Sequence, residues 1–195
     1  MSFWDDGRRR NTGFLLNSVL CNVGWFANVL LAAHKHPLWG PAAQVALVFL
    51  HVFLVCPLYE LDWRGEVVLI LASVLYAAVV ESFLGYFFPV VPWTVAPPFI
   101  LALWANFAMC LNVSLGFLKS TSFPWVPAVL GLVFGPVSYW SGIKLGAIEV
   151  PHDLMLFMAL IAIEWCISFP FLVWLAKSQT PKVESVGTAT PEQEA

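Results

Sequence analysis

The chain alternates between long apolar stretches and short polar or proline-rich breaks. A helix needs about 20 apolar residues, each rising about 1.5 Å, to cross the hydrocarbon core of a bilayer. Six stretches approach that length, so the pattern predicts six transmembrane helices. Their approximate bounds are 13–33, 42–60, 67–88, 98–118, 123–147 and 154–176. We therefore expect an all-α bundle that forms one domain over residues 1–176, followed by a disordered cytoplasmic tail over residues 177–195, which is polar and contains prolines.

The first apolar stretch follows Arg8, Arg9 and Arg10, an arrangement that secretory signals share. Residues 13–33 are longer than the roughly 7–15 apolar residues of a signal core, and no small-residue cleavage pattern follows them. The sequence thus predicts a first helix that is retained in the membrane.

Positive charges set the expected orientation, because lysines and arginines near helix ends are held on the cytoplasmic side. With a cytoplasmic N-terminus and six crossings, both termini lie inside the cell, and most of the nine basic residues lie there too. The inner ones are Arg8, Arg9, Arg10, Arg64, Lys119, Lys177 and Lys182, and the outer ones are Lys35 and Lys144. The prediction is a multi-pass membrane protein with both termini in the cytoplasm.

Composition narrows the class further. Hydrophobic residues make up 60% of the 195 residues and charged residues 11%, against about 25% charged in soluble domains. The mean hydropathy is +0.81. These values exclude a water-soluble globule, and a net charge of −3 leaves no basic face for nucleic acid. The lipid bilayer is therefore the expected partner.

Five polar side chains fall inside the apolar stretches, roughly 10 to 16 Å below the expected outer helix ends. They are Asn22, His51, Glu81, Asn106 and Glu164. Their similar depths predict one intramembrane polar site, because buried charges and amides must be paired or functional. One hypothesis has the two glutamates exchange protons near neutral pH, with the histidine as a relay. The other has neutral carboxyls and amides that only hydrogen-bond the helices together.

A stripe of small residues marks the expected contact face of the fifth helix, since small side chains let helix backbones approach closely in lipid. The stripe consists of Gly131, Gly135, Ser138, Gly142 and Gly146. It predicts a packing seam within the bundle, with a homo-oligomer contact as the alternative.

Chemical signatures are sparse. The four cysteines lie in four separate apolar stretches without C-x-x-C spacing, which favours a packing role. Polar loop residues gather on the expected outer side at His34, His36, Glu149, His152 and Asp153, but flexible loops give them no defined geometry. Hydrolase and nucleotide motifs are absent. The sequence therefore predicts no metal and no cofactor.

Several blocks resemble a known family. The clearest are Leu-Trp-x-x-Phe at residues 103–107 and Gly-Pro-x-x-Tyr-x-x-Gly at residues 135–142, with further likeness at residues 81–84 and 164–170. The chain resembles the bacterial multi-pass membrane family catalogued as domain of unknown function 2878 over residues 17–176. It carries Glu81 where that family pattern tends to have Asp. The resemblance implies a bacterial inner-membrane protein and supplies no reaction.

Three functions fit these observations. The favoured one is a small transporter or lipid-handling protein that uses the intramembrane polar site for a lipid or small-molecule substrate. A membrane-embedded enzyme that modifies lipids is the first alternative, because a buried carboxyl beside an apolar groove can serve as a general acid or base. A non-catalytic scaffold that binds membrane-protein partners is the second.

Overall fold

The computed structural model describes residues 3–123 and 125–179, and within them the regular elements are all helical. In chain order these elements are α1 (Phe3–Ala33), α2 (Trp39–Leu50), the π-helix η1 (His51–Val55), α3 (Cys56–Tyr59), α4 (Trp63–Phe87), α5 (Pro98–Leu111), the 3₁₀-helix η2 (Gly116–Lys119), α6 (Trp125–Lys144) and α7 (Leu154–Ser178).

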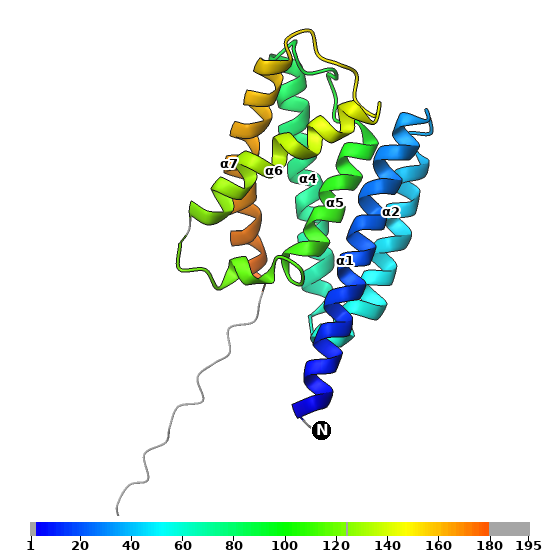
Figure 1. Cartoon of the computed structure of the whole chain (residues 1–195), viewed down its shortest axis with the longest axis vertical. Coiled ribbons are helices and arrows are strands. Elements are labelled where there is room, and N and C mark those ends of the chain that lie inside the picture. Colours follow the sequence, from blue (N-terminus) through cyan, green and yellow to red (C-terminus); the bar gives the residue numbers. More distant parts are fainter. Residues whose placement is uncertain (1–2, 124, 180–195) are drawn as a thin grey trace, which may run out of the picture.

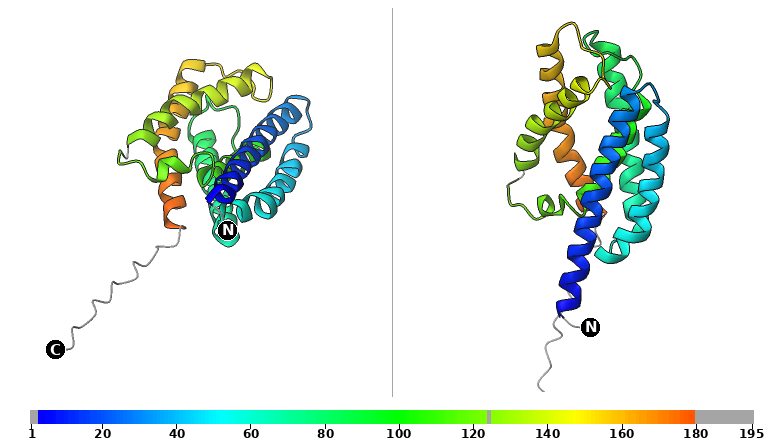
Figure 2. Two further views of the ribbon diagram at one scale, coloured as in Figure 1. Left: turned by 60° about the horizontal axis from the view of Figure 1, so that its bottom comes forward. Right: turned by 45° about the vertical axis from the view of Figure 1, so that its right-hand side comes forward.

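The helices form one bundle in which α4 and α5 lie between two outer pairs. In Figure 1, α1 and α2 lie on the right, and α6 crosses in front of α7 on the left. Figure 2 shows the same separation of α1 and α2 from α6. Helix α5 packs against α1, α2, α4 and α7, so it forms the centre of the bundle. The described chain begins and ends at the bottom of Figure 1. We call this end of the bundle the lower end and the opposite end the upper end.

Five helical segments are long and apolar enough to cross a membrane, and the sixth predicted span is a shorter apolar helix, so the expectation of six spans is not confirmed. They are Asp6–Ala33, Trp39–Tyr59, Trp63–Phe87, Trp125–Lys144 and Leu154–Ser178. The predicted span 98–118 contains only the 14 residues of α5, a length of about 21 Å. Helix α5 stops because the side chains of Asn112 and Ser114, just after its end, hydrogen-bond to buried polar groups of other helices. Helix α7 reaches Ser178, and most of the predicted tail lies outside the described residues.

The second span changes helix type before it ends. Pro57 has no amide hydrogen to donate to the preceding turn, and the five residues of η1 lie just before it. Glu60 then takes a left-handed conformation with φ 56°, which reverses the chain. Asp62 caps α4 by accepting from the amides of Arg64 and Gly65, each at 3.1 Å. This tight reversal brings the end of the second span beside the start of α4.

The proline-rich connection after α4 folds back onto that helix. Val91 is buried, and the indole of Trp93 donates to the backbone carbonyl of Glu81 at 3.1 Å. The amide of Ala96 donates to the hydroxyl of Ser82 at 3.0 Å. The connection therefore closes the upper end of the bundle above Glu81.

The small-residue stripe begins as a seam between α6 and α7, the pair with the most extensive contact. A Cβ atom at Gly131 would overlap the backbone carbonyl of Trp165, and one at Gly135 would overlap the Trp165 side chain. Ser138 instead faces α1, where its hydroxyl accepts from the indole of Trp25 at 3.2 Å.

The upper part of the stripe behaves differently. Gly142 faces Ile148, which belongs to the turn after α6. Gly146 lies beyond the helix, because α6 ends at Lys144, and it adopts φ +83°. That conformation suits glycine at a helix C-terminus, so Gly146 serves the turn and not a helix contact.

Candidate functional site

The five polar residues singled out in the sequence lie in three places in the fold. Glu81 and Glu164 approach each other near the upper end. Asn22 and Asn106 line a cavity beside them. His51 lies apart, in η1, where it pairs with a glutamate that the sequence analysis did not select.

The upper cluster consists of Glu81 on α4, Trp104 on α5, Tyr139 on α6 and Glu164 on α7. Glu81 is fully buried, and one carboxyl oxygen accepts from the Trp104 indole at 3.0 Å and from the Tyr139 hydroxyl. Glu164 is buried close enough to Glu81 for the two carboxyls to interact electrostatically. Within the described part of the chain, Oε2 of Glu81 and both carboxyl oxygens of Glu164 have no hydrogen-bond partner.

A side cavity of about 410 Å³ lies next to this cluster, bounded by α1, α5, α6 and α7. Trp104 and Tyr139 line it, so the groups that hold Glu81 also form its wall. Asn22 is exposed and its amide donates to the backbone of Ser18 one turn earlier. Asn106 is buried and its amide donates to the carbonyl of Cys21 on α1 at 2.9 Å. The cavity thus connects the two asparagines with the surroundings of the carboxyl pair.

The lower cluster is a chain of hydrogen bonds formed by Asn17, His51, Glu66, Asn112 and Lys119. Nε2 of His51 lies 3.1 Å from a carboxyl oxygen of Glu66, and both side chains are almost fully buried. The amide of Asn112 donates to the other oxygen of Glu66. The ammonium of Lys119 donates to the Asn112 carbonyl oxygen at 2.6 Å. Burial lowers the pKa of the Lys119 amine from its ordinary value.

The surroundings of Asn17 define the histidine tautomer. Its amide nitrogen donates to the backbone of Met109 at 2.9 Å and approaches Nδ1 of His51 at 3.3 Å. Its carbonyl oxygen accepts from the hydroxyl of Ser114 at 2.5 Å. Because Asn17 presents its donor to Nδ1, neutral His51 carries its hydrogen on Nε2 and donates it to Glu66.

Cys56 adjoins this pair. The ligand atoms of His51, Cys56 and Glu66 lie within 4.8 Å of one another, the one such metal-capable group that the described residues form. The hydrogen on Nε2 points at Glu66 and not toward a shared ion, so the arrangement fits a hydrogen-bonded pair better than a metal centre. Sequence reasoning missed Glu66 because it precedes the apolar stretch at residues 67–88, where charged residues usually lie in water.

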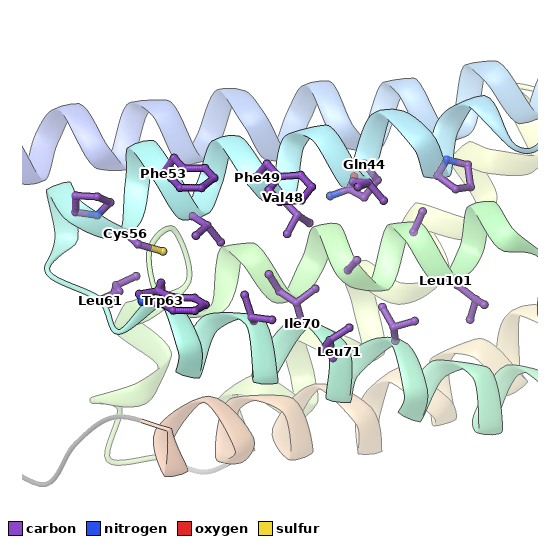
Figure 3. Close-up of a pocket in the computed structure, with 18 of the residues that line it drawn as sticks. Gln44, Val48, Phe49, Phe53, Cys56, Leu61, Trp63, Ile70, Leu71 and Leu101 are labelled. Carbon is purple, nitrogen blue, oxygen red and sulfur yellow. The ribbon is translucent and has the colours of Figure 1, made fainter.

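A large groove opens between α2 and α4, and α5 forms its floor. Its volume is about 1030 Å³, at the upper end of the range typical of ligand pockets. Figure 3 shows Val48 and Phe49 on α2, Ile70 and Leu71 on α4, and Leu101 on α5, all lining this space. The lining is almost entirely apolar, so the groove suits hydrocarbon.

The lower end of the groove is polar by contrast. Cys56, Glu60 and Trp63 lie there, and Cys56 links the groove to the buried His51 and Glu66 pair. Arg9 of α1 lies 3.6 Å from the Glu60 carboxylate, and the Arg64 guanidinium lies 5.4 Å from the Trp63 ring centre. The groove is thus apolar along its length and charged at one end.

Comparisons with known proteins identify one family for the chain. Searches of the curated proteins and of the solved structures found no match. A family model described as protein of unknown function (DUF2878) matches residues 14–171, which include every helix from the body of α1 to most of α7. Because that match covers well over half of its length, the chain belongs to this family.

Proposed function

We propose that this protein binds an amphipathic membrane lipid in the groove between α2 and α4 and moves or presents it within the bilayer. The observation that carries the proposal is the groove itself, which is apolar for most of its length and charged at its lower end. Hydrocarbon chains would lie against α2, α4 and α5. The polar headgroup would lie at the lower end, beside the Glu60 carboxylate that lines the groove and the Arg9 guanidinium that is paired with it.

The orientation follows from the same charges. Arg8, Arg9, Arg10, Arg64 and Lys119 belong to segments at the lower end of the bundle. By the positive-inside rule we infer that this end faces the cytoplasm and that the protein resides in the inner membrane of a bacterial cell. The lipid headgroup would then be taken up from the cytoplasmic leaflet.

The upper cluster supports a second candidate function, proton-coupled transport of a small solute. Buried carboxyl oxygens without hydrogen-bond partners are costly unless they are protonated or used. Glu81 and Glu164 would exchange protons, and Asn106 would contact a solute in the side cavity. Lipid binding ranks first because the groove is the larger and more apolar space.

The test uses two leucines that lie one helical turn apart on α4. Leu71 lines the groove, whereas Leu75 does not, and their side chains are 62% and 69% exposed. Leu71→Trp would fill the groove, and Leu75→Trp would add the same bulk to the ordinary lipid-facing surface. Purified variants in mild detergent are analysed by native mass spectrometry for retained phospholipid, and by photocrosslinking to a phospholipid that carries a diazirine in its acyl chain.

Wild type and Leu75→Trp should retain and crosslink the phospholipid, and Leu71→Trp should lose at least about tenfold in both signals, since about 1.4 kcal/mol of binding is one factor of ten. Equal labelling of the two variants would refute a groove-specific site. Glu164→Gln in the same assay separates the candidates, because groove binding leaves it unaffected. If Glu164→Gln abolishes uptake of protons with a solute into vesicles while lipid retention is normal in all variants, the second function replaces the first.

A further inference from the structure

Two cysteines from distant parts of the sequence meet inside the bundle. Cys21 lies on α1 and Cys110 near the end of α5, and their sulfur atoms are 2.6 Å apart. Both thiols are free. A disulfide bond is about 2.05 Å long, so a movement of about 0.6 Å would join them. The other two cysteines, Cys56 on α3 and Cys166 on α7, take no part in this contact.

The thiol pair faces the side cavity. Cys21 and Cys110 both line it, together with the rings of Trp104, Phe107 and Trp165. Trp104 and Trp165 are stacked with ring centres 4.7 Å apart, and Phe107 meets Trp165 edge-on at 5.1 Å. A planar aromatic ring is the ligand shape that such walls favour.

A hydroxyl group completes the cavity wall. The hydroxyl of Ser138 accepts from Trp25, which leaves its own hydrogen available to a carbonyl oxygen. The carbonyl oxygen of Asn106 is buried and has no hydrogen-bond partner among the described residues. The wall thus offers a donor for a carbonyl oxygen, whereas the Asn106 oxygen is enclosed against Gly24 of α1.

We propose that Cys21 and Cys110 form a redox-active dithiol that reduces a lipid-soluble quinone bound in the side cavity. Both S–H bonds break and one S–S bond forms. The two electrons and two protons released convert the quinone to its hydroquinone, so atoms and charge balance. Ser138 donates to a carbonyl of the quinone. This redox activity is separate from lipid binding in the groove.

The experiment uses the purified full chain, fully reduced and kept without oxygen, and tetramethyl-1,4-benzoquinone as the probe. Four methyl groups leave no ring position open to thiol addition, so only electron transfer remains. Hydroquinone is measured by absorbance, remaining thiols by maleimide labelling and intact mass, and the disulfide by peptide mass spectrometry. Cys166→Ser serves as the matched control, because Cys166 is also half-buried but does not line the cavity.

We expect wild type and Cys166→Ser each to form about one hydroquinone per chain and to lose two thiols as a link between Cys21 and Cys110. Cys110→Ser should form none. The decisive result is hydroquinone formation by wild type and Cys166→Ser, so poor folding of Cys110→Ser would not change the conclusion. No hydroquinone from wild type, or hydroquinone without a link between Cys21 and Cys110, overturns the proposal.

Discussion

The two buried acidic clusters differ in how many hydrogen-bond partners their carboxyl oxygens have. In the lower cluster, both oxygens of Glu66 have partners, and the chain of hydrogen bonds continues through His51 to Asn17 and through Asn112 to Lys119. In the upper cluster, three of the four carboxyl oxygens have no partner among the described residues. The carboxyls of both clusters are buried, so burial alone does not distinguish their roles.

The difference indicates that the two clusters have different roles. A buried polar network whose members are all satisfied rigidifies the elements that it joins. The lower cluster joins α1, η1, α4 and the segment after α5, so it holds together the reversal at the lower end of the bundle. Buried carboxyl oxygens that the fold leaves unsatisfied cost stability and do not hold helices together. We therefore propose that the lower cluster is structural and that the upper cluster is the site that the second proposed function would use.

The largest effect should come from removing the carboxylate of the lower cluster. Glu66→Leu leaves the Nε2 hydrogen of His51 and the amide of Asn112 without their acceptor. Breaking a buried pair in this way typically costs about 3–5 kcal/mol. We expect a loss of that size in the free energy of unfolding, measured by SDS titration from mild detergent micelles. Glu149→Leu, at an exposed loop position, should change it by less than about 0.5 kcal/mol. A loss below about 1 kcal/mol for Glu66→Leu would show that the network does not hold the fold.

A smaller effect should separate the two upper glutamates. Glu81→Leu strands two buried donors, the Trp104 indole and the Tyr139 hydroxyl, and unsatisfied buried groups cost about 1–3 kcal/mol each. We expect a loss of about 2–3 kcal/mol in the same titration. Glu164→Leu strands no donor that Glu164 is seen to hold, so its stability should be equal to wild type or higher. A comparable loss in both variants would show that Glu164 is structural too, and the contrast between the clusters would disappear.

The helical membrane architecture could be predicted from the sequence because apolar length is a direct physical requirement of a bilayer. Residues 13–33, 67–88 and 154–176 lie within or close to α1, α4 and α7. The error at 98–118 has a local cause. Residues 112–118 are apolar enough to continue a helix, but the side chains of Asn112 and Ser114 hydrogen-bond to Glu66 and Asn17, contacts that hydropathy does not encode.

Contacts between side chains on different helices could not be predicted from the sequence for a similar reason. Depth estimates give the position of a residue along the membrane normal, but they do not say which side of the bundle it faces. The sequence therefore could not show that His51 lies in a different cluster from Glu81 and Glu164. Glu66 escaped notice because it lies at a helix start, although its partner across the preceding reversal was one of the selected residues. The contact between Cys21 and Cys110 joins residues 89 positions apart and leaves no local pattern.

The smallest effect concerns pH and tests whether the lower cluster extends to Lys119. Burial lowers the pKa of this amine in the folded protein below its ordinary value of 10.5, so in that interval the unfolded chain holds more protons than the folded one. Stability that depends on Lys119 should therefore rise as pH increases through the folded pKa toward 10.5. We expect a small gain in the free energy of unfolding, because the side chain is only partly buried.

This gain is measured as the difference in unfolding free energy between wild type and Lys119→Met from about pH 8 upward. A flat or falling difference for Lys119→Met would mean that the amine is as well hydrated in the fold as in the unfolded chain, and the lower cluster would then end at Asn112.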